Sequence, residues 1–280
     1  YTLRGYFNEQ GLIVKVETWV DNAVLGDLLI EVNYSEYKDF NGLKFPTRIV
    51  QKDGGYPVYD LTITDVKPNV EVTIQSTTAQ AAPVVAAEKI ADGIYNLAGG
   101  GATASVAVEF SDFVAVLEAP LSEMRSLAVI TEVKKLIPNK PIRYLVNTHH
   151  HFDHSSGVRT YVAEGAIIVT HEVNKAFYQS TFKSPHTLNP DKLEQSKKKA
   201  LIESFTDKKI ISDGARTIEL HHIANNLHND GILMIYFPKE RILAVCDMFA
   251  RIPADAAVPE KVSPFTVNLL ENIDRLKLDF

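Results

Sequence analysis

The 280-residue chain contains one cysteine, Cys246, so no disulfide can form within it and the redox compartment stays open. No apolar run approaches the roughly 18–20 residues that span a bilayer, so the sequence predicts a soluble protein without a membrane span. Acidic residues outnumber basic ones, giving a net charge of −6 and a pI near 5.9. This balance argues against a nucleic-acid backbone as the main partner.

Residues 1–75 have the pattern of an antiparallel β-sheet. Turn signals separate the strand-like runs and lie at residues 8–11, 41–42 and 53–55. Alternation of apolar and polar residues over 61–65 predicts a sheet with one buried face. Residues 76–87 (STTAQAAPVVAA) are small and uncharged, which is typical of a linker. We therefore expect separate cores in 1–75 and 88–280.

From residue 88 onward, strand-like and helix-like segments alternate. Leu127, Ile130 and Val133 fall at helical spacing after Ser122, a good capping residue, and predict a helix over 122–138. Strand-like runs follow, and a helical pattern closes the chain. Strands and helices in two alternating blocks predict an α/β sandwich.

Four histidines and an aspartate lie within residues 149–154, directly after the strand-like run IRYLVN. Side chains two apart at a strand end point the same way, so His149 and His151 can reach one metal ion. The chain must then turn, so Asp153 and His154 can face a second ion. A histidine-rich surface loop is the alternative, but this pattern after a buried strand favours a metal site.

Two later segments supply further ligand types. His228 lies between two strand-like runs, and Asp247 follows the run RILAVC. Taken alone, His228 could equally be an ordinary loop histidine, and Asp247 could equally be a turn cap. Taken with the cluster, they complete a two-ion site. The first ion is assigned to His149, His151 and His228, and the second to Asp153 and His154, with Asp247 as the bridge.

The order HxHxDH, then the histidine of LHNDG, then Asp247 resembles the metallo-β-lactamase superfamily of metallohydrolases over about residues 88–280. The resemblance implies an α+β fold, an αββα sandwich with up to two zinc ions at one edge between the sheets. Iron is an alternative metal, because the ligand set suits it too. Residues 1–75 lie outside the resemblance and are similar to β-rich modules of exported bacterial proteins. A periplasmic or secreted location is therefore expected, with a cytoplasmic one as the alternative.

The sequence departs from the family pattern in two places. Cys246 stands where glycine is usual, and a small buried neighbour of Asp247 is favoured over a sulfur ligand. Members usually continue into a strand and a Pro-x-His-Gly segment that carries the last histidine of the second site. Because the sequence stops at Phe280, we expect a carboxyl-terminal truncation and a second site one ligand short. Tyr1 in place of methionine likewise indicates that an upstream segment was removed or left out.

The expected reaction is hydrolysis of a small molecule. Metal-bound hydroxide would attack an ester, lactone, thioester or β-lactam, with Asp153 orienting the hydroxide and moving its proton. Glu118 and His222 are candidates for supporting the ligands. His150 is expected either in an outer position or simply exposed, while His171, His186 and His221 are expected at the surface. An iron-dependent redox relative and a non-catalytic binding or scaffold protein remain alternatives. No oligomeric state follows from the sequence.

Overall fold

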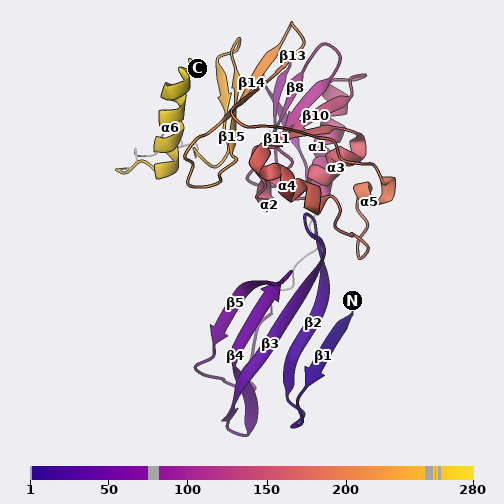
Figure 1. Cartoon of the computed structure of the whole chain (residues 1–280), viewed down its shortest axis with the longest axis vertical. Coiled ribbons are helices and arrows are strands. Elements are labelled where there is room, and N and C mark those ends of the chain that lie inside the picture. Colours follow the sequence, from indigo (N-terminus) through magenta and orange to yellow (C-terminus); the bar gives the residue numbers. More distant parts are fainter. Residues whose placement is uncertain (1, 75–81, 250–254, 256, 258–259) are drawn as a thin grey trace. The chain divides into compact units, whose positions relative to one another are not determined.

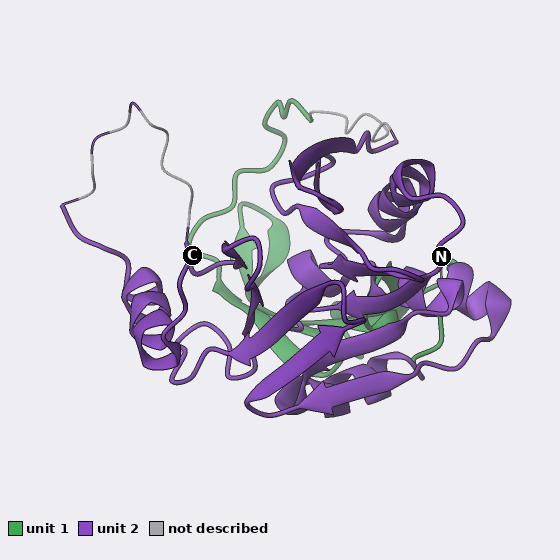
Figure 2. Ribbon diagram, turned by 90° about the horizontal axis from the view of Figure 1, so that it is seen from above, with its two compact units in different colours: residues 1–81, 184–189 green, residues 82–183, 190–280 purple. Residues whose placement is uncertain are grey.

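The structure, a computed structural model, describes residues 2–74, 82–249, 255, 257 and 260–280. The chain divides into two compact units, shown separately coloured in Figure 2. Unit 1 comprises Tyr1–Ala81 and Ser184–Asn189, and unit 2 comprises Ala82–Lys183 and Pro190–Phe280. We describe each unit by itself.

Unit 1 contains a five-stranded antiparallel sheet in the order β1-β2-β3-β4-β5 (Figure 1). Its strands are β1 (Leu3–Phe7), β2 (Ile13–Asn22), β3 (Gly26–Phe40), β4 (Leu43–Asp53) and β5 (Tyr56–Thr62). The three predicted turns are confirmed, since each one joins two of these strands. Between β3 and β4, Asn41 and Gly42 have φ angles of 54° and 89°, the left-handed pair that a tight two-residue hairpin requires.

The predicted burial of one face of this sheet is wrong at its edge. All seven residues of β5 are exposed, and Leu61 keeps 44% of its surface in contact with solvent. The strand also ends at Thr62, so the alternation over 61–65 runs past it. The three clusters of buried apolar residues found among the described residues all lie in unit 2. A period-2 pattern indicates a strand, but burial requires a second layer to pack on it.

Unit 1 also includes Ser184–Asn189, a segment distant in sequence from the sheet. The Asp27 carboxylate accepts hydrogen bonds from the backbone N–H of Thr187 (3.0 Å) and of Leu188 (3.1 Å). The Asp27 N–H donates to the carbonyl of Pro185 at 2.8 Å. The neighbouring Gly26 has φ 80°, and a Cβ there would lie 2.3 Å from the same carbonyl oxygen. Glycine is therefore required where the segment meets the β2–β3 hairpin.

The first half of the predicted linker at 76–87 lies outside the described residues, since only 82–87 are described. Its last two residues already belong to strand β6 (Ala86–Ala91), so the linker ends earlier than predicted. The domain boundaries at 75 and 88 stay a prediction, because Ser184–Asn189 adds a second stretch of chain to unit 1.

Limited proteolysis checks this organisation. We expect a first cut between residues 79 and 85, leaving two folded pieces, because small uncharged residues there have little to pack on. The amino-terminal piece should nevertheless co-elute with the remainder, because Asp27 binds Thr187 and Leu188. Asp27→Ala should release it on a sizing column. Separation of the pieces in the parent protein, or resistance of 79–85 with cutting elsewhere, would contradict the expectation.

Unit 2 is built on two β-sheets. The larger has seven strands in the order β12-β11-β10-β9-β8-β7-β6, with β9 to β12 parallel and β6 to β9 antiparallel. Beyond β6, its strands are β7 (Ile94–Ala98), β8 (Ser105–Glu109), β9 (Val114–Leu117), β10 (Ile142–Val146), β11 (Ile167–His171) and β12 (Ile202–Phe205). The smaller, antiparallel sheet consists of β13 (Lys208–Ser212), β14 (Thr217–His222), β15 (Leu233–Phe237) and β16 (Ile242–Ala244).

The helices of unit 2 are α1 (Glu123–Leu136), α2 (Phe152–Ser155), α3 (Val158–Glu164), α4 (Glu172–Thr181), α5 (Lys192–Ser196) and α6 (Pro264–Leu276). All of them except the short α2 pack on the outer face of a sheet. Helix α1 begins as predicted, because the Ser122 hydroxyl accepts the Arg125 N–H at 3.2 Å. One apolar cluster joins the larger sheet to α1, α3, α4 and α5, a second fills the space between the sheets, and a third joins the smaller sheet to α6.

These three clusters define four layers in the order helices, sheet, sheet, helix (Figure 1). The expected αββα sandwich, preceded by an antiparallel sheet, is therefore confirmed. Strands β9, β10 and β11 are parallel, so their carboxyl ends meet at one edge of the larger sheet, where the motif loops begin. Among the described residues no helix is both long and apolar enough to cross a membrane.

Candidate metal centre

The loop between β10 and α2 carries the histidine cluster. Asn147 and His149 are fully buried, which is unusual for a loop and demands internal hydrogen-bond partners. The Asn147 side chain donates to the carbonyl of His154 at 2.8 Å and accepts from the Tyr178 hydroxyl. The Ser155 hydroxyl donates to the carbonyl of His150 at 3.0 Å. The loop is thus closed on itself and attached to α4.

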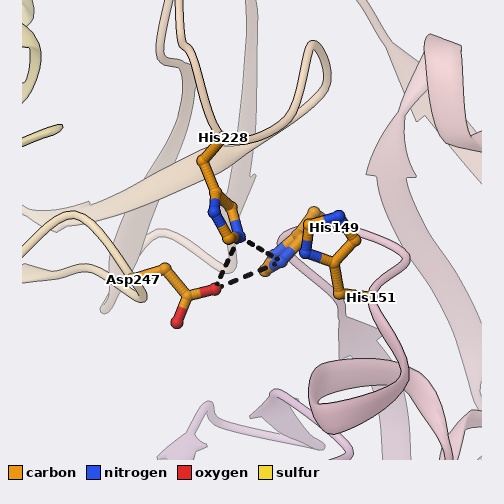
Figure 3. Close-up of side chains that lie close together, drawn as sticks. All are labelled: His149, His151, His228 and Asp247. Atoms are coloured by element: carbon orange, nitrogen blue, oxygen red, sulfur yellow. Dashed lines mark hydrogen bonds and ion pairs between the residues drawn. The ribbon is translucent and has the colours of Figure 1, made fainter. Parts of the chain in front are cut away.

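Four side chains from three loops bring their ligand atoms together (Figure 3). These are His149, His151, His228 and Asp247, whose ligand atoms lie within 4.8 Å of one another. His228 Nε2 is 3.3 Å from His149 Nε2 and 3.0 Å from Asp247 Oδ2. His149 Nε2 is 3.2 Å from the same Oδ2. The loop after β10 and two loops of the smaller sheet therefore converge at one point.

This donor set fits a metal ion by its spacing and chemistry. Two nitrogens bound tetrahedrally to zinc at about 2.0–2.1 Å lie about 3.3 Å apart. The Nε2 atoms of His149 and His228 have this separation, 3.3 Å. Three imidazoles and a carboxylate are ligands that zinc and iron both accept. The His149 side chain is fully buried, whereas those of His228 and Asp247 are 24% and 27% exposed. One side of the set is therefore enclosed and the other open to solvent.

A second group overlaps the first. His154 and Cys246 join His149 and Asp247 with ligand atoms again within 4.8 Å of one another. His154 Nε2 is 3.0 Å from Asp247 Oδ2, and both Asp247 and His149 belong to the two groups. Asp153 belongs to neither group. Its Oδ2 lies 3.6 Å from His154 Nε2, and its side chain is 42% exposed.

Glu118 and Asp247 contact the two ring nitrogens of His154, Glu118 at Nδ1 and Asp247 at Nε2. Glu118 Oε2 lies 2.6 Å from Nδ1 of His154, and Oε1 accepts the Thr148 N–H at 2.7 Å. Both carboxylate residues are in the left-handed region, with φ 67° for Glu118 and 53° for Asp247. Such conformations cost of order 1–3 kcal/mol for non-glycine residues and are concentrated at functional sites. Here they turn two carboxylates back toward one imidazole.

The protonation of these groups follows from the contacts. Burial opposes charge on His154, but hydrogen bonds to Asp247 and Glu118 outweigh it and raise its pKa to about 10. At Asp247, hydrogen bonds from His149 and His154 likewise outweigh the effect of burial, and they lower the pKa of its carboxyl group. Burial and the nearby His149 and His228 lower the pKa of His151 to about 4. His151 thus offers a neutral nitrogen at neutral pH, the form a metal requires.

The half-buried Cys246 places its thiol beside the ligands. Burial, together with the charge of Glu118, raises the pKa of this thiol well above its usual value. Its Sγ lies 2.8 Å from the Thr148 hydroxyl and 3.8 Å from His149 Nδ1. Thr148 Oγ1 is also 3.1 Å from that nitrogen. These contacts fix the His149 ring with Nε2 toward the cluster.

The remaining histidines lie outside both groups. His150 points at α4, with Nδ1 2.8 Å from Asn174 Oδ1. His222, considered for a supporting role, has Nε2 2.8 Å from the Asp230 carbonyl and stacks on His171 at 4.2 Å. The expectation that His171, His186 and His221 lie at the surface is wrong. They are 6%, 1% and 3% exposed, because strand, helix and loop packing encloses each ring.

Sequence reasoning missed the residues that hold the loops. Asn147 and Tyr178 hold the loop after β10, and Asn226 holds the loop of His228 by accepting its N–H at 2.9 Å. The sequence did offer a signal for Asn147, because this polar residue directly follows an apolar run of the kind that forms buried strands. Tyr178 offered none, since an aromatic residue at helical spacing is ordinarily a core residue.

Comparisons with known proteins identify the family of the chain and its fold. The sequence profile of the metallo-β-lactamase superfamily matches residues 98–267. Among solved structures, a metallo-β-lactamase from Pontibacter korlensis is similar, with a TM-score of 0.51, 14% identity, and 68% of this chain and 86% of that chain covered. The DIM-1 metallo-β-lactamase (TM-score 0.49, 14% identity, coverage 70% and 86%) and TMB-1 (0.47, 13%, 69% and 85%) are also similar. No curated protein matches significantly.

Proposed function

The chain belongs to the metallo-β-lactamase superfamily, whose members are in general hydrolases, and we propose that it is a zinc-dependent hydrolase. Its substrate would be a small-molecule ester, lactone, thioester or β-lactam. The observation that carries the proposal is the convergence of His149, His151, His228 and Asp247 within 4.8 Å, open to solvent on one side. A scaffold protein would have no need for three imidazoles and a carboxylate gathered at one point.

His149, His151 and His228 would hold the first ion, and His154 and Asp153 the second, with Asp247 between them. Zinc at such a site supplies a Lewis acid that activates water and polarises a carbonyl oxygen. The chain itself has to orient these ligands and to move protons.

Asp153 is the group proposed to move a proton. Its carboxylate is partly exposed and lies beside the His154 ring, so it can reach both solvent and a bound substrate. Oδ2 would accept the proton of the attacking water and pass it to the leaving group. Glu118 would hold a proton on Nδ1 of His154, and a metal ion bound at Nε2 would displace the second proton, which this histidine carries in the metal-free protein. A supporting role for His222 stays a prediction.

Metal analysis with a hydrolase substrate panel tests the proposal. We expect close to one tightly held zinc ion per chain, because the first set has three histidines and Asp247 already in place. The second set should fill more weakly, because Asp153 lies outside both groups of ligand atoms and its side chain is 42% exposed.

Elemental analysis after dialysis measures the zinc content per chain. Turnover of ester, lactone, thioester and β-lactam substrates then measures the hydrolase activity. Two zinc ions held equally tightly would contradict the stoichiometry, and no metal would contradict the site. Bound iron without hydrolysis would favour a redox function instead. Bound zinc without turnover of any substrate would favour a binding protein.

A further inference from the structure

Helix α6 carries no metal ligand, yet it contacts the loops that carry His228 and Asp247. Its first turn places the Phe265 ring edge-on against the His228 ring, with 5.7 Å between centroids. The Thr266 hydroxyl donates to the carbonyl of Met248, the residue after Asp247, at 2.9 Å. The loops that carry His228 and Asp247 therefore contact the same helix.

Farther along the helix, two buried asparagines hold the backbone before His228. The Asn268 side chain donates to the carbonyls of Ala224 (3.0 Å) and Asn225 (3.3 Å). Asn272 accepts the Ala224 N–H at 2.9 Å and donates to its carbonyl at 3.1 Å. Both polar groups of the Ala224 backbone are thus bonded to α6.

Asn226 connects these contacts to the ligand itself. Its Nδ2 donates to Asn268 Oδ1 at 2.8 Å, while its Oδ1 accepts the backbone N–H of His228 at 2.9 Å. The same Nδ2 lies 2.9 Å from the sulfur of Met248, beside Asp247. We name Asn226, Asn268 and Asn272 the asparagine network.

The burial of this network requires an explanation. The three side chains are 8%, 8% and 3% exposed, and Asn268 and Asn272 lie on the helix face that also buries Leu269 and Ile273. Asparagine is a poorer helix former than leucine or alanine and is costly to bury. An apolar residue at either position would pack without this cost. The amides are favourable only because they satisfy the otherwise unpaired backbone of the His228 loop.

We propose that α6, through the asparagine network and Thr266, is a positioning element that sets His228 and Asp247 at metal-binding distance. The inference rests on the proposed metal site of the previous subsection and adds residues that touch neither metal nor substrate. Partners that orient metal ligands in this way typically change metal affinity 10–100-fold when removed.

The test compares Asn268→Ala with two controls on the same helix. Leu269→Ala removes buried packing but no hydrogen bond, and Glu271→Ala changes an exposed residue. Thr266→Val keeps the side-chain shape and removes only the bond to Met248, so it serves if Asn268→Ala fails to fold. The readouts are the zinc dissociation constant, the visible spectrum of the cobalt(II)-loaded protein, and hydrogen exchange of residues 222–232 in metal-free protein.

We expect Asn268→Ala to weaken zinc binding about 10–100-fold, to alter the cobalt spectrum and to speed exchange over 222–232. Thr266→Val should weaken zinc binding several-fold. Leu269→Ala should lower the melting temperature but keep the parent's affinity and spectrum, and Glu271→Ala should change neither.

Parent-like affinity and spectrum in both Asn268→Ala and Thr266→Val would overturn the proposal. So would an equal loss of affinity in Leu269→Ala, because packing alone would then explain the effect. A parent that binds zinc but turns over no substrate would refute the proposed hydrolase without affecting this inference. If the parent binds no zinc, the positioning of metal ligands is overturned together with the site, whatever the exchange over 222–232.

Discussion

His149→Ala is expected to abolish zinc binding and hydrolysis together. The His149 side chain is fully buried and belongs to both groups of ligand atoms, so its removal leaves each group one nitrogen short. Turnover should fall to the level of the zinc-stripped parent. Zinc content, turnover and thermal unfolding of the same preparation measure the effect.

His150→Ala is the matched control, because it makes the same change at the neighbouring histidine. The His150 ring contacts Asn174 and contributes to neither group of ligand atoms. We expect its zinc content and turnover to stay within about threefold of the parent, the range of an ordinary change outside the site. If His149→Ala keeps its zinc, or if both variants lose it equally, the assignment of the ligands is wrong.

Asp153→Asn should retain zinc but lose most of the turnover. Asparagine keeps the size and one oxygen of the side chain but cannot accept a proton at Oδ2. Removing a positioned acid–base group typically lowers the rate by about 10²–10⁴. The fold should barely respond, since the Asp153 side chain is 42% exposed. The measurement is turnover of whichever substrate the panel identifies, with zinc content determined in parallel.

Asp112→Asn supplies the control for this charge change. Asp112 is exposed in the turn between β8 and β9, at the opposite end of β9 from Glu118. The Asp112→Asn variant should hydrolyse the substrate at the parent's rate. Asp153→Asn with full zinc and the parent's rate would show that proton transfer follows another route. Loss of zinc in Asp153→Asn would instead make this residue chiefly a ligand.

Much of the fold could be predicted because its signals are local. The Asn41-Gly42 turn needs only two residues that tolerate positive φ, and α1 needs only Ser122 and its apolar spacing. The His149–His154 cluster is equally local. Its residues are close in sequence, so any compact turn after β10 brings them near one another.

Other features depend on contacts between distant segments. Period-2 alternation does not distinguish a covered strand face from the exposed β5. The segment Ser184–Asn189 binds Asp27, and the two residues of one such hydrogen bond are 160 positions apart. No sequence motif predicts this contact. The burial of His171 and His221 likewise arises from neighbours that the local sequence does not identify.

The side chains of the proposed metal site could be identified from the sequence, because imidazole and carboxylate groups are common zinc ligands. How these side chains come together depends on the packing of the layers. His228 and Asp247 reach His149 because the smaller sheet packs on the larger one, and the asparagine network of α6 holds the loop of His228. Glu118 turns toward His154 through a left-handed backbone that no sequence pattern specifies. Ligand identity is a property of single residues, whereas ligand distance is a property of the packed layers.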